Sequence, residues 1–108
     1  MQERKWGRVV AITSYGVRQP IPTLIYSNTA RAGATGFLKT VAREVAKDGV
    51  TVNSVQPGSH ATDRLKSLNR NDLGAVANAI PAGFVGDPGD FGSVISSARG
   101  PPGPCVSE

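Results

Sequence analysis

Residues 8–37 read RVVAITSYGVRQPIPTLIYSNTARAGATGF, and this stretch decides the fold. It opens with a short apolar run from Val9 to Ile12, largely β-branched, which is typical of a strand buried on both faces. The run ends at Thr13 and Ser14, so we expect hydroxyl groups at the carboxyl end of a strand. Ligands of open α/β sheets bind at that edge. The stretch therefore predicts an α/β fold with a site near Ser14.

A long helix is predicted after the proline-rich loop, from about Ser27 to Lys47. Ser27 or Asn28 is expected to cap its N-terminus, and Asp48-Gly49 to end it. Its small and apolar residues recur on one face at helical spacing: Ala30, Ala34, Phe37, Leu38, Val41, Ala42 and Val45. Four small residues on the first turns predict close packing onto a sheet: Ala30, Gly33, Ala34 and Gly36.

A second buried strand is predicted over Val50–Val55, with a turn at Pro57-Gly58. Residues 62–80 carry spaced leucine, valine and isoleucine and are expected to be helical. Asp87-Pro88 has the pattern of a helix start, with an acidic cap and proline at the first helical position.

These segments resemble the catalytic part of the short-chain dehydrogenase/reductase family. That family pairs a strand-end Ser with Tyr-x-x-x-Lys on the next helix, and a Gly-Phe pair follows the Lys. Gly36-Phe37 resembles this pair. Counting back from it puts Arg31 at the family's Lys, Ser27 at its Tyr and Ser14 at its catalytic Ser. The sequence thus carries Ser-Asn-x-x-Arg in place of Tyr-x-x-x-Lys.

Two later segments extend the resemblance, which covers roughly residues 6–97. Val50–Val55 followed by Pro57-Gly58 is similar to the family's strand that ends in Pro-Gly, and Thr62 matches its cofactor-contacting Thr. Residues 80–88 resemble the segment before the family's last helix. The resemblance implies an oxidoreductase that uses NADP or NAD on a carbonyl or alcohol, with a 3-oxoacyl-type substrate as one case.

The resemblance also implies roles for the candidate residues. Ser14 would orient the substrate carbonyl, and Arg31 would bond the nicotinamide ribose while keeping a positive charge. Ser27 is too weak an acid to replace the family's Tyr unaided, so Tyr26, one position earlier, is the alternative proton donor if the helix start shifts by one residue. A second interpretation of Tyr26 is a loop aromatic packed beside Ile25. The predicted catalytic set is Ser14, Tyr26, Ser27 and Arg31, and the predicted cofactor-binding set is Arg31, Pro57, Gly58 and Thr62.

The Gly-x-Gly-x-x-Gly turn that binds the cofactor's pyrophosphate in such folds is absent from the sequence. We therefore expect the chain to be the C-terminal half of a Rossmann-like, doubly wound parallel sheet, and to be inactive alone. Residues 1–98 form the partial dehydrogenase domain, and the Gly/Pro-rich residues 99–108 are expected to be a disordered tail. A fragment or a shifted reading frame would explain this organisation.

The charge and composition of the sequence restrict the partners that we expect for this protein. The 108 residues carry a net charge of +4 with the cations spread along the sequence, so we expect no nucleic-acid partner. No apolar run is long enough to span a bilayer and no signal peptide is evident, so we expect no membrane partner and a cytoplasmic location. His60 is the only His and no second ligand suggests a metal. A homo-oligomer is expected for a full-length form, as in the family.

Two other function classes stay open. The substituted Tyr and Lys positions permit a non-catalytic relative that keeps the fold for binding or pairing. An unrelated basic binding module is the weaker alternative, because no aromatic–basic cluster is evident in the sequence.

Overall fold

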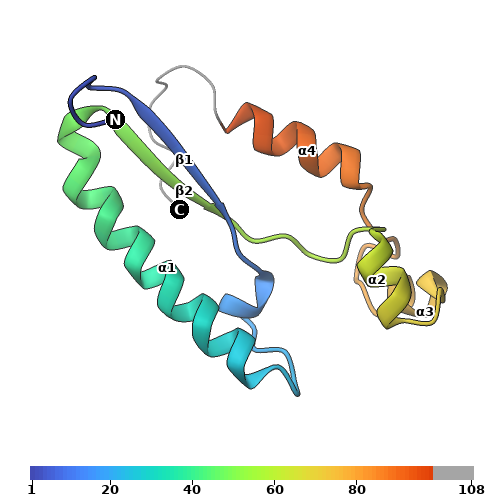
Figure 1. The fold of residues 1–108 in the computed structure, drawn as a ribbon. Helices are drawn as coiled ribbons and strands as arrows, with labels where there is room; N and C mark the ends of the chain where they lie inside the picture. The colour runs from blue at the N-terminus through green and yellow to red at the C-terminus, as the bar shows by residue number, and fades with distance from the viewer. Residues whose placement is uncertain (99–108) are drawn as a thin grey trace.

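A computed structural model describes residues 1–98, and the predicted tail at 99–108 lies outside the described residues. Two strands and a long helix form one part of the chain, and three shorter helices follow (Figure 1). The elements in order are β1 (Gly7–Ile12), the 3-10 helix η1 (Tyr15–Val17), α1 (Ile25–Val45), the 3-10 helix η2 (Ala46–Asp48), β2 (Val50–Val55), α2 (Asp63–Leu68), α3 (Leu73–Asn78) and α4 (Pro88–Ser97).

The two strands are parallel neighbours, and the register pairs Gly7 with Val50 and Ile12 with Val55. β2 has the predicted bounds, and β1 begins two residues earlier than the apolar run. The prediction of strands buried on both faces is wrong for the described residues: Val50 is the one buried hydrophobic residue, and Ile12 is 56% exposed. A parallel strand is buried on both faces only when helices cover both faces of its sheet. Here α1 contacts β2, and Figure 1 shows no comparable helix packed along the other side.

Helix α1 begins two residues before the predicted start. Its N-cap position is Leu24, which has no side-chain cap, so neither Ser27 nor Asn28 caps the helix. The Asn28 side chain instead donates to the Ile21 carbonyl at 2.9 Å and accepts the Ile21 N–H at 3.3 Å. This pair of bonds holds the proline-rich loop against the first turn. The predicted stop is confirmed, because η2 ends at Asp48 and its C-cap Gly49 has a left-handed conformation with φ of 68°.

The prediction for the buried face of α1 holds only for its second half. Leu38, Val41, Ala42 and Val45 are partly buried, on the helix that packs against β2. Phe37 is 67% exposed, and Ala30 and Ala34 are exposed as well. A side chain added at Gly33 or Gly36 would meet open space. The predicted close packing of these small residues onto the sheet is therefore wrong within this chain.

The segment 62–80 forms two short helices instead of one, because α2 ends at Leu68 and the chain turns through Arg70 and Asn71 with positive φ. The predicted start of α4 is confirmed. Asp87 caps it by accepting the N–H groups of Gly89 and Asp90, and Pro88 occupies the first turn. A short parallel bridge between His60 and Gly86 ties the beginning of this segment to its end.

The molecule is extended. Its radius of gyration is 16.2 Å, whereas a compact chain of this length has about 13 Å. Its accessible surface is 8067 Å², whereas a folded monomer of 11.2 kDa has about 5,700 Å². Much apolar surface is therefore uncovered. Over the described residues, no helix combines the length and the hydropathy needed to cross a membrane.

Candidate functional site

The carboxyl ends of the two strands are joined by Thr13. Its N–H donates to the Val55 carbonyl at 2.9 Å, and its hydroxyl lies 3.1 Å from the Ser54 hydroxyl. Thr13 is 8% exposed, so these bonds are shielded from water and favour one arrangement of the two strand ends. The two strand ends are therefore held in one arrangement at the edge of the sheet that is predicted to carry the site.

Ser14 directly follows Thr13 at this edge of the sheet, and it is the N-cap of η1. Its hydroxyl oxygen accepts the Gly16 N–H at 3.2 Å, which leaves the hydroxyl hydrogen for another partner. Gly16 is buried, and a Cβ there would lie 3.2 Å from the Asn28 side-chain oxygen and from Ile21. The turn after β1 is thus packed against the start of α1, and this contact positions Ser14 between strand and helix.

The structure brings Arg31 to the same strand exit. Its Nη1 donates to the Thr13 carbonyl at 2.6 Å, and its Nε donates to the Ser27 hydroxyl oxygen at 3.2 Å. Ser27 and Arg31 lie one turn apart on α1, which places both on the same face. The outer Nη2 group is left for a ligand, because a guanidinium has five N–H donors. Ser14, Ser27 and Arg31, three members of the predicted catalytic set, therefore lie around one strand end.

Tyr26 lies elsewhere. It belongs to the first turn of α1, beside Ser27, and its side chain is 90% exposed. Neighbouring helix positions point about 100° apart, so Tyr26 and Ser27 do not share a face. Since α1 begins at Ile25, both residues are helical.

The predicted cofactor-binding residues follow β2. The Pro57 carbonyl accepts the Tyr15 N–H at 3.3 Å, so the exits of both strands run side by side. Gly58 is exposed, and a Cβ there would meet nothing within 4 Å, so its backbone is open to a ligand. Thr62 lies further along as the N-cap of α2, where its hydroxyl oxygen accepts the Leu65 N–H at 3.3 Å.

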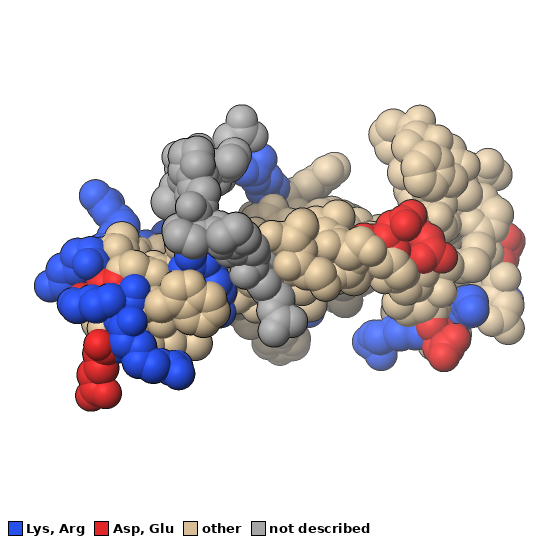
Figure 2. Space-filling model, turned by 90° about the horizontal axis from the view of Figure 1, so that it is seen from above, with Lys and Arg blue, Asp and Glu red and all other residues tan. Residues whose placement is uncertain are grey.

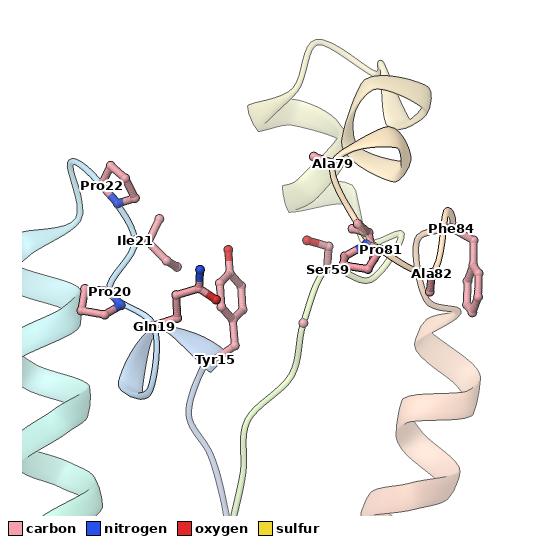
Figure 3. Close-up of a pocket in the computed structure, with 12 residues that line it drawn as sticks. Tyr15, Gln19, Pro20, Ile21, Pro22, Ser59, Ala79, Pro81, Ala82 and Phe84 are labelled. Carbon is pink, nitrogen blue, oxygen red and sulfur yellow. The ribbon is translucent and has the colours of Figure 1, made fainter.

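An open cavity of about 530 Å³ lies between these exits and the segment after α3 (Figure 3). Tyr15 and Gly58 line it at the strand ends. Its wall combines loop residues from four parts of the chain: Tyr15, Gln19, Pro20, Ile21, Pro22, Gly58, Ser59, Ala79, Ile80, Pro81, Ala82 and Phe84. Sequence reasoning missed Tyr15 and Ser59, although Tyr15 directly follows the strand-end Ser14 and that adjacency was the available signal.

None of the described residues that line this cavity is charged. Figure 2 shows many Lys and Arg side chains at the end of the molecule where β1 begins and α1 ends, and a smaller group of basic and acidic side chains at the other end. At the end where β1 begins, the Lys5 ammonium and the Gln2 amide donate to the Asp48 carboxylate. The hydrogen bond from Lys5 lowers the pKa of Asp48 below its usual value. Within residues 1–98, no cluster of three metal-ligating side chains is found.

The comparison with known proteins assigns the class. A profile of the short chain dehydrogenase family matches residues 1–73, and the chain belongs to this family. It is 40% identical over 96 residues to the 3-oxoacyl-(acyl-carrier-protein) reductase FabG of Vibrio harveyi, covering 88% of this chain and 39% of that protein. It is 41% identical over 97 residues to the acetoacetyl-CoA reductase of Cupriavidus necator, covering 89% of this chain and 39% of that protein. The chain thus spans about two-fifths of the length of these relatives.

Solved structures agree with the fold. A variant of actinorhodin polyketide ketoreductase with NADPH superposes with a TM-score of 0.87 and 27% identity, over 94% of this chain and 43% of that one. A second structure is a short chain oxidoreductase from Pseudomonas aeruginosa PAO1 with NADPH bound, described as containing an atypical catalytic center. It superposes with a TM-score of 0.79 and 26% identity, over 87% of this chain and 39% of that one. The predicted α/β fold is confirmed.

Proposed function

We propose that this chain is the catalytic part of an NAD(P)-dependent reductase that converts a carbonyl, of the 3-oxoacyl type, into an alcohol. The observation that carries the proposal is the bonding of Arg31 to the Thr13 carbonyl and to Ser27. This bonding gathers the residues at the family's three catalytic positions around the exit of β1. The names of the two curated relatives support a 3-oxoacyl substrate.

Ser14 has the orienting role in this proposal, since its hydroxyl hydrogen is left to donate to a carbonyl oxygen. Ser27 and Arg31 form the atypical Ser-Asn-x-x-Arg motif. The Pseudomonas structure, whose description names an atypical catalytic center, supports a family member that departs from Tyr-x-x-x-Lys. Tyr26 remains the alternative phenol predicted from the sequence, although its 90% exposure favours it less.

The cofactor is NADP or NAD, and the NADPH-bound structural relatives support this choice. Arg31 has an unused Nη2 group for a ribose hydroxyl, and Gly58 offers uncovered backbone beside Pro57, so the residues present fit a nicotinamide nucleoside. Thr62 would contact the cofactor from the start of α2. When bound, the cofactor supplies a hydride, while the residues named here bind and orient.

The uncovered surface supports a larger assembly. The excess of about 2,400 Å² over a compact monomer is of the size buried in stable interfaces. We infer that residues 1–98 are the later half of a doubly wound sheet whose remaining strands carry the phosphate-binding turn. The exposed outer face of α1 supports a homo-oligomer. A single Cys fits the reducing cytoplasm, which is the location we propose.

The second candidate is a non-catalytic family member that keeps the fold for binding or pairing. The feature that favours it is the residue type of Ser27, because a serine hydroxyl is a much weaker acid than the phenol that the family carries at this position. Cofactor-dependent turnover separates the two candidates.

The test is a chimera in which residues 1–98 replace the matching segment of the Vibrio harveyi reductase, assayed with NADPH and an acetoacetyl thioester. We expect turnover from the chimera and loss of most of it in Ser14→Ala, with Ser93→Ala on α4 as the control for an exposed hydroxyl. The 108-residue chain alone is expected to bind no NADPH by fluorescence titration. A folded chimera that binds NADPH without turnover would favour the non-catalytic candidate.

A further inference from the structure

Among the described residues, Tyr15 is the one titratable side chain that lines the cavity. The other lining residues are aliphatic, proline, glycine or phenylalanine, apart from the neutral polar Gln19 and Ser59. The sequence contains two tyrosines, and the second, Tyr26, is exposed on α1 and is not among the described residues that line the cavity. Among the described residues that line the cavity, Tyr15 therefore offers the most acidic side-chain proton to a bound substrate.

The backbone holds Tyr15 firmly at this position. Its N–H donates to the Pro57 carbonyl at 3.3 Å, and its own carbonyl accepts the N–H groups of Arg18 at 3.0 Å and Gln19 at 3.1 Å. The next residue is the buried Gly16, which has no room for a side chain. The phenol thus stands on the same rigid turn as Ser14, one residue further from the strand.

The phenol projects between the two walls of the cavity. In Figure 3 the Tyr15 ring stands beside Gln19 and Ile21 with its hydroxyl at the open end, and Ser59 lies across the gap on the other wall. A carbonyl group that enters from the open side would meet this hydroxyl among largely apolar neighbours.

We propose that Tyr15 is the proton donor to the substrate's carbonyl oxygen, in place of the tyrosine that is Ser27 here. This inference rests on the proposed function. In the step, the carbonyl carbon gains the hydride of the reduced nicotinamide cofactor and the carbonyl oxygen gains the phenolic proton. The carbon–oxygen double bond becomes a single bond, the cofactor is oxidised, and the tyrosinate recovers its proton from water.

The test follows the phenol directly and needs no cofactor. The 108-residue chain is labelled with 3-fluorotyrosine, and the two ¹⁹F resonances are assigned with Tyr15→Phe and Tyr26→Phe. Acetoacetyl-N-acetylcysteamine is then titrated in, with butyryl-N-acetylcysteamine as the matched ligand that lacks the 3-oxo group. We expect the Tyr15 resonance to shift with the first ligand and not with the second.

A shift caused equally by both ligands, no shift at Tyr15, or a shift at Tyr26 instead would each overturn the inference. Circular dichroism of Tyr15→Phe, which keeps the ring in the cavity wall, verifies folding. In the chimera, Tyr15→Phe is expected to lower kcat by about 10²–10⁴-fold with little change in KM. An active chimera with unchanged kcat in Tyr15→Phe would overturn the inference and leave the proposed function standing. The NMR titration decides the role of Tyr15 even if the chimera is inactive.

Discussion

Arg31 determines the character of the site at the scale of single residues. A lysine ammonium at this position would be a compact point charge, whereas the planar guanidinium bonds the Thr13 carbonyl and Ser27 together. The same side chain therefore links α1 to the strand exit and bonds Ser27, the residue that we propose to lie at the family's tyrosine position. Because a serine hydroxyl is a weak acid, the proposed acid chemistry depends on a phenol elsewhere, and Tyr15 lies in the cavity wall.

Restoring the family motif tests this exchange of roles. In the chimera, Ser27→Tyr combined with Arg31→Lys is expected to make the protein tolerant of Tyr15→Phe, because a second phenol becomes available beside Ser14. The kcat penalty of Tyr15→Phe should fall from about 10²–10⁴-fold to below about 10-fold. Each single substitution is the control. If Tyr15→Phe lowers kcat as much in the combined variant as in the chimera without it, Tyr15 does not take the role of the family's tyrosine.

Asp48 gives the fold a pH dependence. The Lys5 hydrogen bond lowers the pKa of Asp48 from 3.8, so the ionised carboxylate stabilises the folded state. This contribution is fully present above the usual value and is lost as pH falls through the lowered pKa. Urea unfolding should show that Asp48→Asn lowers the free energy of unfolding near neutral pH, with a difference that shrinks below about pH 4. A difference that is constant down to pH 2 would contradict this.

At the scale of elements, α1 has two unlike halves. Its C-terminal half packs its apolar side chains against β2, whereas the small residues of its first half face outward. The helix was predictable from its periodicity and from the Gly49 stop. Which part of its face is covered was not predictable, because the pattern is the same whether a sheet or another helix covers it.

Two glycine substitutions separate backbone conformation from helix propensity. Gly49→Ala is expected to destabilise the chain by about 1–2 kcal/mol, because Gly49 has φ of 68° and an added Cβ would collide with the Lys5 carbonyl oxygen. Gly36→Ala is the matched control and should stabilise by about 0.5–1 kcal/mol, because α1 is helical there and the space is open. Denaturant midpoints measure both. Equal changes in the free energy of unfolding for Gly49→Ala and Gly36→Ala would contradict the left-handed conformation of Gly49 as the cause.

At the scale of the whole molecule, the open surface is the dominant property. A two-stranded sheet with one packed helix leaves an accessible area well above that of a compact chain of this mass. The exposed large residues include Ile25, Phe37 and Val94, from both helical regions. Burying such surface is the main driving force for association, and the proposed homo-oligomer would bury it through α1.

Sedimentation of two phenylalanine variants tests that face. Phe37→Ser removes an apolar side chain, 67% exposed, from the outer face of α1 and should shift the chain toward smaller species. Phe84→Ser removes one of similar exposure, 66%, from the cavity wall and should not. Equal sedimentation of the two variants would show that association does not use α1.

The sequence by itself determined the local elements and the family. The β-branched run predicted β1, helical spacing and Gly49 predicted α1, and Asp87-Pro88 predicted α4, because each signal depends on neighbours a few residues away. The spacing back from Gly36 also predicted Ser14, Ser27 and Arg31 as site residues, and this stays a prediction.

Only the tertiary structure decided what surrounds those residues. It showed that Arg31 bonds Ser27, that Asn28 holds the proline-rich loop instead of capping a helix, and that Tyr15 lines a cavity whose other wall begins at Gly58. More than forty residues separate these two walls in the sequence. The physical reason is that a cavity forms where distant loops meet, and no local periodicity records which side chains such a meeting brings together.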